Sequence, residues 1–286
     1  MMAILGDNRY GKAEVRVVRV DRSSEPHTLS DWNVSVSLAG DMREVHLSGA
    51  NDRVLPTDTQ KNTVYALAQQ LGAVEPEVFA LTLARHFVDR QAGISRARVQ
   101  LHSYGWTAVG PHSLVRSGAE VRTVTVLHDE QSGSWVVGGL RELTLLNTTD
   151  SEFWGFARDE FTTLAETTDR ILATSVEARW RFRNADCNWA AAYARARQAL
   201  VDAFVSTYSY SLQQTLYAMG CRVLAEVPEA CEVRLALPNK HHFLVDLQPF
   251  GQPNDNEVYL AADRPYGLIE GQVLADDAPD AGPAWP

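Results

Sequence analysis

The chain has 286 residues, of which 45% are hydrophobic and 22% are charged, and its formal net charge is −10. This composition is typical of a globular protein that can bury a core without disulfides or metals, and the length suffices for two domains. The acidic balance argues against nucleic acid as the main partner, and no apolar run reaches the roughly 18 residues of a membrane-spanning helix.

Cysteine usage and the two ends of the chain predict a cytoplasmic protein. The 3 cysteines form no C-x-x-C pair, which argues against a disulfide framework or a zinc site and fits a reducing compartment. Residues 1–11 contain no apolar signal core, so secretion is not expected. The C-terminal sequence Ala284-Trp285-Pro286 is unlike a peroxisomal signal.

The first half reads as two strands, two helices and two strands. Period-2 alternation predicts the strands, and apolar residues at helical spacing predict the helices. Asp58 or Thr59 is expected to cap the first helix and Gly72 to end it, while Pro76 suits the first turn of the second. The predicted elements span residues 14–20, 33–38, 60–71, 76–91, 96–108 and 120–128.

The second half repeats this order after roughly 140 residues. Its predicted elements span residues 135–148, 171–183, 188–205, 212–226, 231–237, 242–247, 257–261 and 268–274, with a break at 206–211. We therefore predict an α+β protein with domains at 1–134 and 135–275 and a mobile tail at 276–286. Free sheet edges are a liability, so an oligomer that pairs them is expected.

Metal and nucleotide sites are not indicated. The 8 histidines are scattered except for His241 and His242, which as neighbours on a strand face opposite sides and cannot chelate one ion. No H-E-x-x-H, G-x-G-x-x-G or Walker-type sequence occurs. The sequence thus predicts no metal and no cofactor.

Two predicted helix starts carry polar residues that suit an anionic ligand. Thr57-Asp58-Thr59 precedes the first helix, and Ser211-Leu212-Gln213 opens the last one. Unpaired N–H groups and the positive end of the helix dipole favour an anion at such places. The alternative is simple capping by Thr, Asp and Ser.

Other polar and aromatic residues each have an ordinary explanation. Lys12 at a strand end is usually solvated, and Arg170 beside Asp169 is usually a surface ion pair. His241 follows a strand break and is usually a hydrogen-bonded structural residue, while Phe153 by default belongs to the core. Taken singly, none of them indicates a site.

Together these segments resemble the urate oxidase (uricase) family. The resemblance runs from about Tyr10 to Leu274, in the family's order and at similar spacing. The matching segments are 10–12 (YGK), 57–63 (TDTQKNT), 153–156 (FWGF), 159–164 (DEFTTL), 166–172 (ETTDRIL), 212–213 (LQ) and 237–243 (LPNKHHF).

The resemblance implies the tunnelling fold, in which each subunit has two tandem domains, each an antiparallel sheet with two helices. Two subunits would close a barrel, and two barrels would stack into a homotetramer with active sites between subunits. The implied activity is the oxidation of urate by O2 to 5-hydroxyisourate and hydrogen peroxide, without metal or cofactor.

The resemblance also assigns site residues by motif. Substrate would be bound by the Arg170 and Gln213 side chains, stacking on Phe153, the backbone N–H groups of Asp58 and Leu212, and the wall residue Leu164. Leu212 stands where the family has Val, which matters little for a backbone contact. Lys12 and Thr57 of the neighbouring subunit would relay protons with help from His241, and Thr57 and Asn239 would hold O2 and then water. Such a relay needs a Lys12 pKa lowered by burial or a nearby cation.

Two other functions fit the pattern less well. A related fold acting on pterins, an aldolase or cyclohydrolase, would grip its substrate with a glutamate and often hold zinc, whereas this chain has the Arg-plus-Gln pair. A purine-binding scaffold without chemistry is favoured only if Lys12, Thr57 or His241 is missing, and all three are present.

Overall fold

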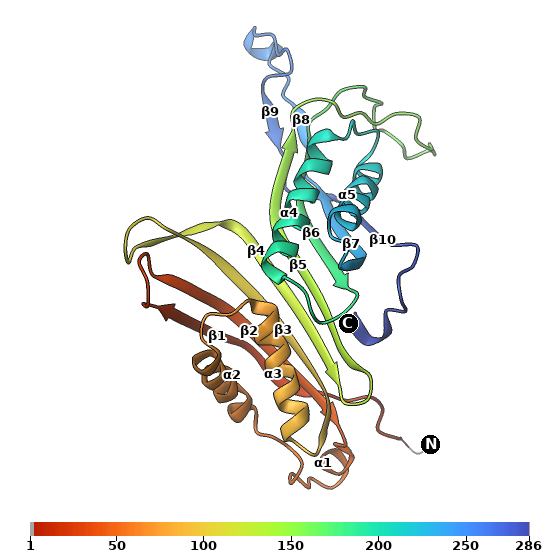
Figure 1. Cartoon of the computed structure of the whole chain (residues 1–286). Helices are drawn as coiled ribbons and strands as arrows, with labels where there is room; N and C mark the ends of the chain where they lie inside the picture. Colours follow the sequence, from red (N-terminus) through yellow and green to blue (C-terminus); the bar gives the residue numbers. More distant parts are fainter. Residues whose placement is uncertain (1–2, 286) are drawn as a thin grey trace.

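An antiparallel sheet of eight strands runs through the chain, in the order β1-β2-β3-β4-β5-β6-β7-β10 (Figure 1). The computed structural model describes residues 3–285. The sheet strands are β1 (Tyr10–Asp21), β2 (Thr28–Gly40), β3 (Ile94–Ala108), β4 (Leu114–Asp129), β5 (Gly133–Asn147), β6 (Leu172–Phe182), β7 (Ala230–Asn239) and β10 (Gly267–Leu274). A separate hairpin pairs β8 (His242–Leu244) with β9 (Tyr259–Ala261). The predicted α+β class is confirmed.

Four long helices lie against one face of this sheet. They are α2 (Thr57–Leu71), α3 (Pro76–Arg90), α4 (Trp189–Ser206) and α5 (Leu212–Glu226), with a short α1 (Arg43–Leu47) that the sequence did not predict. Pro76 begins α3, and Gly72 ends α2 at a positive φ of 71°, as expected. The Asn188 side chain caps α4 by accepting from the Ala191 N–H. None of the helices within residues 3–285 is long and apolar enough to cross a membrane.

The chain repeats itself in two halves of four sheet strands and two long helices. β1–β4 with α2 and α3 form the first, and β5, β6, β7 and β10 with α4 and α5 form the second. The first strand of each half has a bulge, at Lys12/Val15 and at Leu140/Leu143. The boundary at 134/135 stays a prediction, because the β4–β5 hairpin joins both halves into one ladder.

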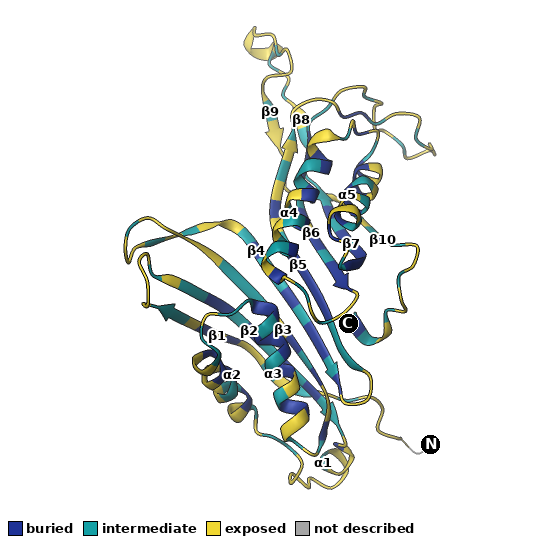
Figure 2. Cartoon of the chain, in the orientation of Figure 1, coloured by how far each residue is buried: buried dark blue, intermediate teal, exposed yellow. Residues whose placement is uncertain are grey.

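The core lies between the sheet and its helices, and Figure 2 shows the buried residues of these strands and helices in dark blue. Alternate residues such as Val34, Leu101 and Trp180 are buried there, as the period-2 pattern predicts. The opposite face of the sheet is polar and carries arginines, among them Arg96 and Arg98 on β3. One face is therefore a protein core, and the other is left for water or another copy.

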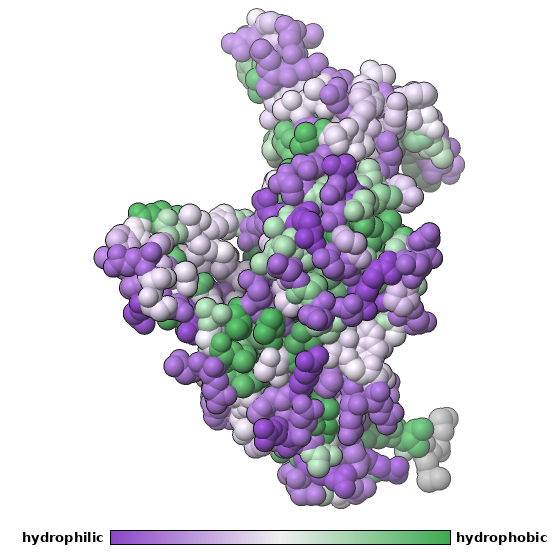
Figure 3. Space-filling view, in the orientation of Figure 1, coloured by the Kyte–Doolittle hydropathy of each residue, from purple (hydrophilic) through white to green (hydrophobic). Residues whose placement is uncertain are grey.

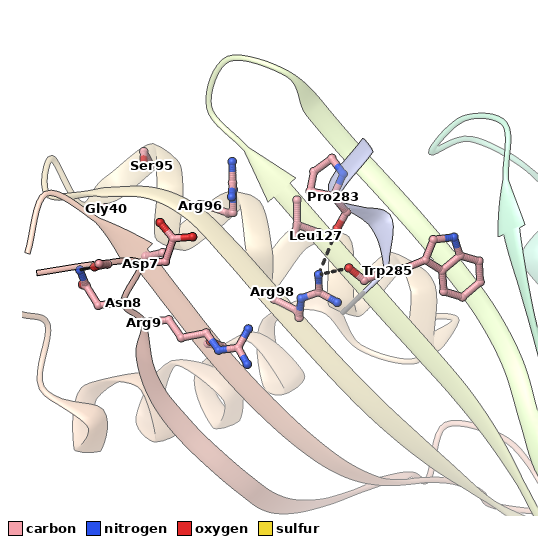
Figure 4. Close-up of a pocket in the computed structure, with 13 residues that line it drawn as sticks. Asp7, Asn8, Arg9, Gly40, Ser95, Arg96, Arg98, Leu127, Pro283 and Trp285 are labelled. Atoms are coloured by element: carbon pink, nitrogen blue, oxygen red, sulfur yellow. Dashed lines mark hydrogen bonds between the residues drawn. The ribbon is translucent and has the colours of Figure 1, made fainter. Parts of the chain in front are cut away.

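The last residues of the chain lie across this helix-free face. Arg98 donates through Nη2 to the carbonyl oxygens of Pro283 (3.0 Å) and Trp285 (3.2 Å), as the dashed lines in Figure 4 show. Arg181 on β6 donates to other carbonyl oxygens of the same segment. The described part of the predicted tail, 276–285, therefore lies on the sheet, where its carbonyls accept hydrogen bonds from these guanidinium groups. Its mobility stays a prediction, and residue 286 lies outside the described part.

Candidate active site

Lys12 lies on the helix-covered face of the sheet because of the bulge in β1. It pairs with Val36, whereas Val15 pairs with Val34, so β1 has one extra residue between these positions. Residues directly opposite in an antiparallel pair share a face, and Val36 is buried under the helices. Without the bulge, strict alternation from Val15 would turn Lys12 to the other face.

Helix α2 begins beside this lysine at Thr57. The helix packs on β1, and the Tyr10 hydroxyl accepts a hydrogen bond from the Leu55 backbone N–H (2.9 Å), which ties the loop before α2 to the strand. Pro56 occupies the N-cap position, and no side chain caps this helix. The predicted cap at Asp58 or Thr59 is therefore wrong, because the helix starts earlier than the apolar pattern.

The first N–H groups of α2 are available to a ligand. The first intrahelical bond runs from the Gln60 N–H to the Pro56 carbonyl, so the N–H groups of Thr57 and Asp58 precede it. The Asp58 carboxyl has a lowered pKa, caused first by its hydrogen bond to Lys61 and then by the Lys61 charge, with smaller contributions from Asn62 and Lys12. Because α2 packs on β1 and the Leu55 N–H is bonded to Tyr10, two residues before Lys12, the residues Lys12, Thr57 and Asp58 share one region, which we name the relay half-site.

A second cluster lies in the other half of the chain. The Arg170 guanidinium is 5.4 Å from the centroid of the Phe153 ring, and burial lowers its pKa. Its Nε is buried with no hydrogen-bond partner among the described residues. The Lys240 N–H donates to the Ala173 carbonyl (2.8 Å), which holds the chain next to His241 against the strand that follows Arg170. Burial, followed by the charges of Arg170 and His242, lowers the pKa of His241. An arginine with an unpaired donor over an aromatic ring suits a flat anionic ligand.

Helix α5 adds a polar start to this second cluster. Ser211 caps it by accepting from the Gln214 N–H (3.2 Å), so capping is confirmed here. The first intrahelical bond of α5 runs from the Thr215 N–H to the Ser211 carbonyl. The N–H groups of Leu212 and Gln213 come before this bond and have no partner within the helix. Capping and ligand binding are thus compatible at one helix start.

Asn239 and Leu164 complete the predicted set. Asn239 ends β7, where it pairs with Thr174 of β6 and Gly267 of β10, two residues before His241. Leu164 lies on the loop between β5 and β6 with 56% of its surface exposed. Phe153, Leu164, Arg170, Leu212, Gln213, Asn239 and His241 form what we name the clamp half-site.

The two half-sites lie at opposite ends of the sheet. Their separation can be measured along β5. Following the paired residues from β1 across β2, β3 and β4 leads from Lys12 to Val136 of β5. Near the other end of β5, Asn147 pairs with Leu172, two residues after Arg170. Positions 136 and 147 are eleven residues apart, or roughly 36 Å of strand at about 3.3 Å per residue. In Figure 1, β1 begins near the lower end of the molecule and β8 lies at the upper end. One chain therefore cannot bring both half-sites to one ligand.

A cavity lies elsewhere on the molecule, away from both half-sites. It has a volume of about 900 Å³ and is lined by Arg9, Arg96, Arg98 and Trp285 on the helix-free face (Figure 4). No residue of either half-site lines it. This cavity is therefore separate from the predicted site.

Three supporting residues were missed by the sequence reasoning. Tyr10 anchors the start of α2, while Ser209 and Thr215 are buried hydroxyl residues that bond to each other near the start of α5 (2.8 Å). Tyr10 belongs to a quoted motif, and Ser209 to a segment read only as a break. Tyr10 and its partner Leu55 are 45 residues apart in the chain, so no local sequence pattern indicates their hydrogen bond. Ser209 and Thr215 are 6 residues apart.

Comparisons with known proteins cover both half-sites. The family model for uricase matches residues 8–127 and 136–270. The uricase of Arthrobacter globiformis is 48% identical over 284 residues, which are 99% of this chain and 93% of the relative. That of Dictyostelium discoideum is 36% identical over 95% of this chain and 98% of its own length. The crystal structure of the Arthrobacter globiformis uricase superimposes with a TM-score of 0.96 at 46% identity, covering 100% of this chain and 99% of that one. All the predicted site residues fall inside the segments that the family model matches.

Proposed function

The chain belongs to the uricase family, and from this premise we propose that it oxidises urate with O2 at a site shared between two copies. It is a urate oxidase, and it has the α+β tunnelling fold that the sequence predicted. The overall reaction consumes urate, O2 and water and yields 5-hydroxyisourate and hydrogen peroxide. Two electrons pass from urate to O2, and a water oxygen is added to the ring.

The separation of the two half-sites within one chain is the observation that supports an active site shared between two copies. Each chain holds one relay half-site and one clamp half-site, so two copies can complete two sites. Both edges of the sheet, β1 and β10, lack a further strand among the described residues, and pairing them with a second copy closes a barrel. Figure 3 shows an apolar patch on the left, at the tip of the β3–β4 hairpin, where Val109 is 66% exposed. Such surface suits contacts in the proposed homotetramer.

The clamp half-site fixes the flat anion. The Arg170 fork and the Gln213 amide donate to it from one side, the Phe153 ring stacks on it, and Leu164 lines the wall. The chain has a net charge of −10, so a local cation is needed to hold urate, and Arg170 supplies it. The N–H groups of Leu212 and of the partner's Asp58 donate to the heteroatoms of the ring.

The relay half-site removes protons and so makes urate a better electron donor. Lys12 takes the hydroxyl proton of Thr57, which takes one from the substrate, and His241 of the other copy assists this relay. Thr57 and Asn239 hold O2, and then water, over the ring. The protein supplies bases, position and a dry site, while the substrate itself supplies the electrons.

Urate turnover by metal-free protein tests this function. The purified chain is dialysed against chelator and mixed with urate while urate absorbance, dissolved O2 and peroxide are followed. We expect urate and O2 to disappear in equal amounts and peroxide to appear in the same amount. Activity that is lost on chelation and returns with added metal overturns the cofactor-free mechanism, and absence of turnover in both states overturns the function.

A further inference from the structure

Two buried hydroxyl groups, those of Ser209 and Thr215, lie at the start of α5, next to the residues of the clamp half-site. We propose that Ser209 and Thr215 are positioning residues, which hold the start of α5 against the segment carrying Phe153 and Arg170. This inference rests on the proposed function. Both side chains are fully buried, and neither belongs to the set that would contact urate.

The hydroxyl groups form a chain that ends on the cap of α5. The Thr215 Oγ1 donates to the Ser209 Oγ (2.8 Å), and the Ser209 Oγ donates to the Ser211 carbonyl (3.1 Å). Ser211 is the N-cap residue, so this chain fixes the residue that sets the direction of Leu212 and Gln213. Hydrogen bonds in series polarise each other when buried, which makes the arrangement stiffer than its separate bonds.

The backbone of Ser209 is bonded in turn to the segment that carries Phe153. The Glu152 N–H donates to the Ser209 carbonyl (2.8 Å), and the Ser209 N–H donates to the Asp150 carbonyl (3.0 Å). The Arg170 N–H donates to the Ser151 carbonyl (2.9 Å) on the same segment. Ser209 therefore stands between the backbone that carries Arg170 and Phe153 and the helix that presents Gln213.

A clamp built from separate segments needs such a link. Phe153 and Arg170 lie in the connection between β5 and β6, whereas Gln213 lies in the first turn of α5. Misplacement of such groups by about 1 Å weakens binding and catalysis strongly. The Thr215–Ser209–Ser211 chain is the buried side-chain contact among the described residues that joins the cap of α5 to the bridge at Ser151.

Thr215→Val removes the first hydroxyl of the chain and keeps the shape of the side chain. We expect KM for urate to rise about tenfold while kcat changes by less than about twofold, because the link positions the clamp and leaves the relay untouched. The dissociation constant of xanthine, a purine that shares the pyrimidinedione ring of urate, should rise by the same factor. Thr215→Ser restores the hydroxyl and should restore KM.

Thr174→Val is the matched control. Thr174 is also fully buried, but its Oγ1 has no hydrogen-bond partner among the described residues. Its replacement removes the same atoms without breaking a link, so KM should stay at the wild-type value. Thermal unfolding of all variants at one protein concentration shows whether they are folded, and Ser209→Ala replaces Thr215→Val in the test if the latter is not.

The outcomes separate this inference from the proposed function. If the wild type oxidises urate but the KM of Thr215→Val equals that of Thr174→Val, the positioning inference is wrong and the function stands. A fall in kcat alone, with an unchanged KM and xanthine affinity, also overturns it. If the wild type neither oxidises urate nor binds xanthine, the function fails and this inference fails with it.

Discussion

A single extra residue decides where the proposed base lies. The β1 bulge puts Lys12 on the face of Val36, beside the start of α2, and the Glu14 N–H at the bulge donates to the Ser35 hydroxyl (2.9 Å). Glu14 has a φ of 56°, an uncommon value outside glycine that the bulge imposes. Local backbone geometry thus selects which residue of the strand faces the site.

His241 is expected to be neutral and able to accept a proton at neutral pH. Burial, then the charge of Arg170, then that of His242 lower its pKa from 6.5. The folded state therefore binds a proton less readily than the unfolded chain, and the neutral form persists below pH 6.5. Activity that needs neutral His241 is lost only as the pH falls through this lowered pKa.

The pH profile of kcat/KM tests this expectation. The wild type should keep its activity at pH 6.5 and lose it at lower pH, and His241→Asn should be less active with that acidic limb removed. His86→Asn is the control, because the pKa of His86 is also lowered by burial, but its helix α3 carries no site residue. An acidic limb that survives in His241→Asn would show that another group titrates.

At the scale of elements, the two ligand-facing helix starts differ in how they are held. Ser211 caps α5 with its side chain, whereas α2 has Pro56 at the cap and relies on the Tyr10–Leu55 bond. Polar residues at both starts look alike in sequence, yet only one performs capping. The hydroxyl of Thr57 is therefore left for the proposed relay.

Two alanine variants should separate capping from catalysis. Ser211→Ala should lower the free energy of unfolding by about 1 kcal/mol, since it removes a helix cap. Thr57→Ala should leave stability nearly unchanged and lower kcat by about 10²-fold or more, as expected for a lost proton relay. Thermal unfolding at fixed protein concentration and steady-state kinetics give both values. A Thr57→Ala protein with normal kcat would exclude that relay.

In the whole molecule, the sheet separates the relay half-site from the clamp half-site, although the proposed reaction needs both at one substrate. The relay and clamp half-sites are roughly 36 Å of strand apart, because each lies at its own end of the sheet. In the proposed arrangement, a second copy turned end for end would bring a relay half-site to each clamp half-site. We therefore expect activity to require assembly, because motion within one chain cannot close this separation.

Complementation between inactive variants tests this arrangement. Lys12→Met and Arg170→Gln should each be inactive alone, the first through kcat and the second through binding. Co-expressed in equal amounts, they should regain about a quarter of wild-type activity, because random pairing gives half of the pairs one intact site out of two. Mixing chains that both carry Lys12→Met is the control and should give none. Absence of recovery in verified mixed oligomers would place both half-sites of each active site in one chain.

The order of elements could be predicted from the sequence because burial on one face leaves a local period. Residues such as Val34, Val36 and Leu38 alternate, Pro76 and Gly72 mark helix ends, and these signals lie within a few residues of one another. The strand ends do not follow from this period, since β4 begins at Leu114 and its first residues, 114–120, are exposed or half-buried and show no alternation of apolar and polar residue types.

The family motifs identified the candidate residues, but only the tertiary structure decided which of them lie together. Lys12 reaches its face through a bulge that alternation cannot reveal, and Arg170 meets Phe153 through bridges between distant segments. Such contacts join residues far apart in the chain, where no local pattern records them. Periodicity and motifs therefore predict the elements and the residue types of the candidate site, whereas the packing of the sheet divides these residues between two half-sites.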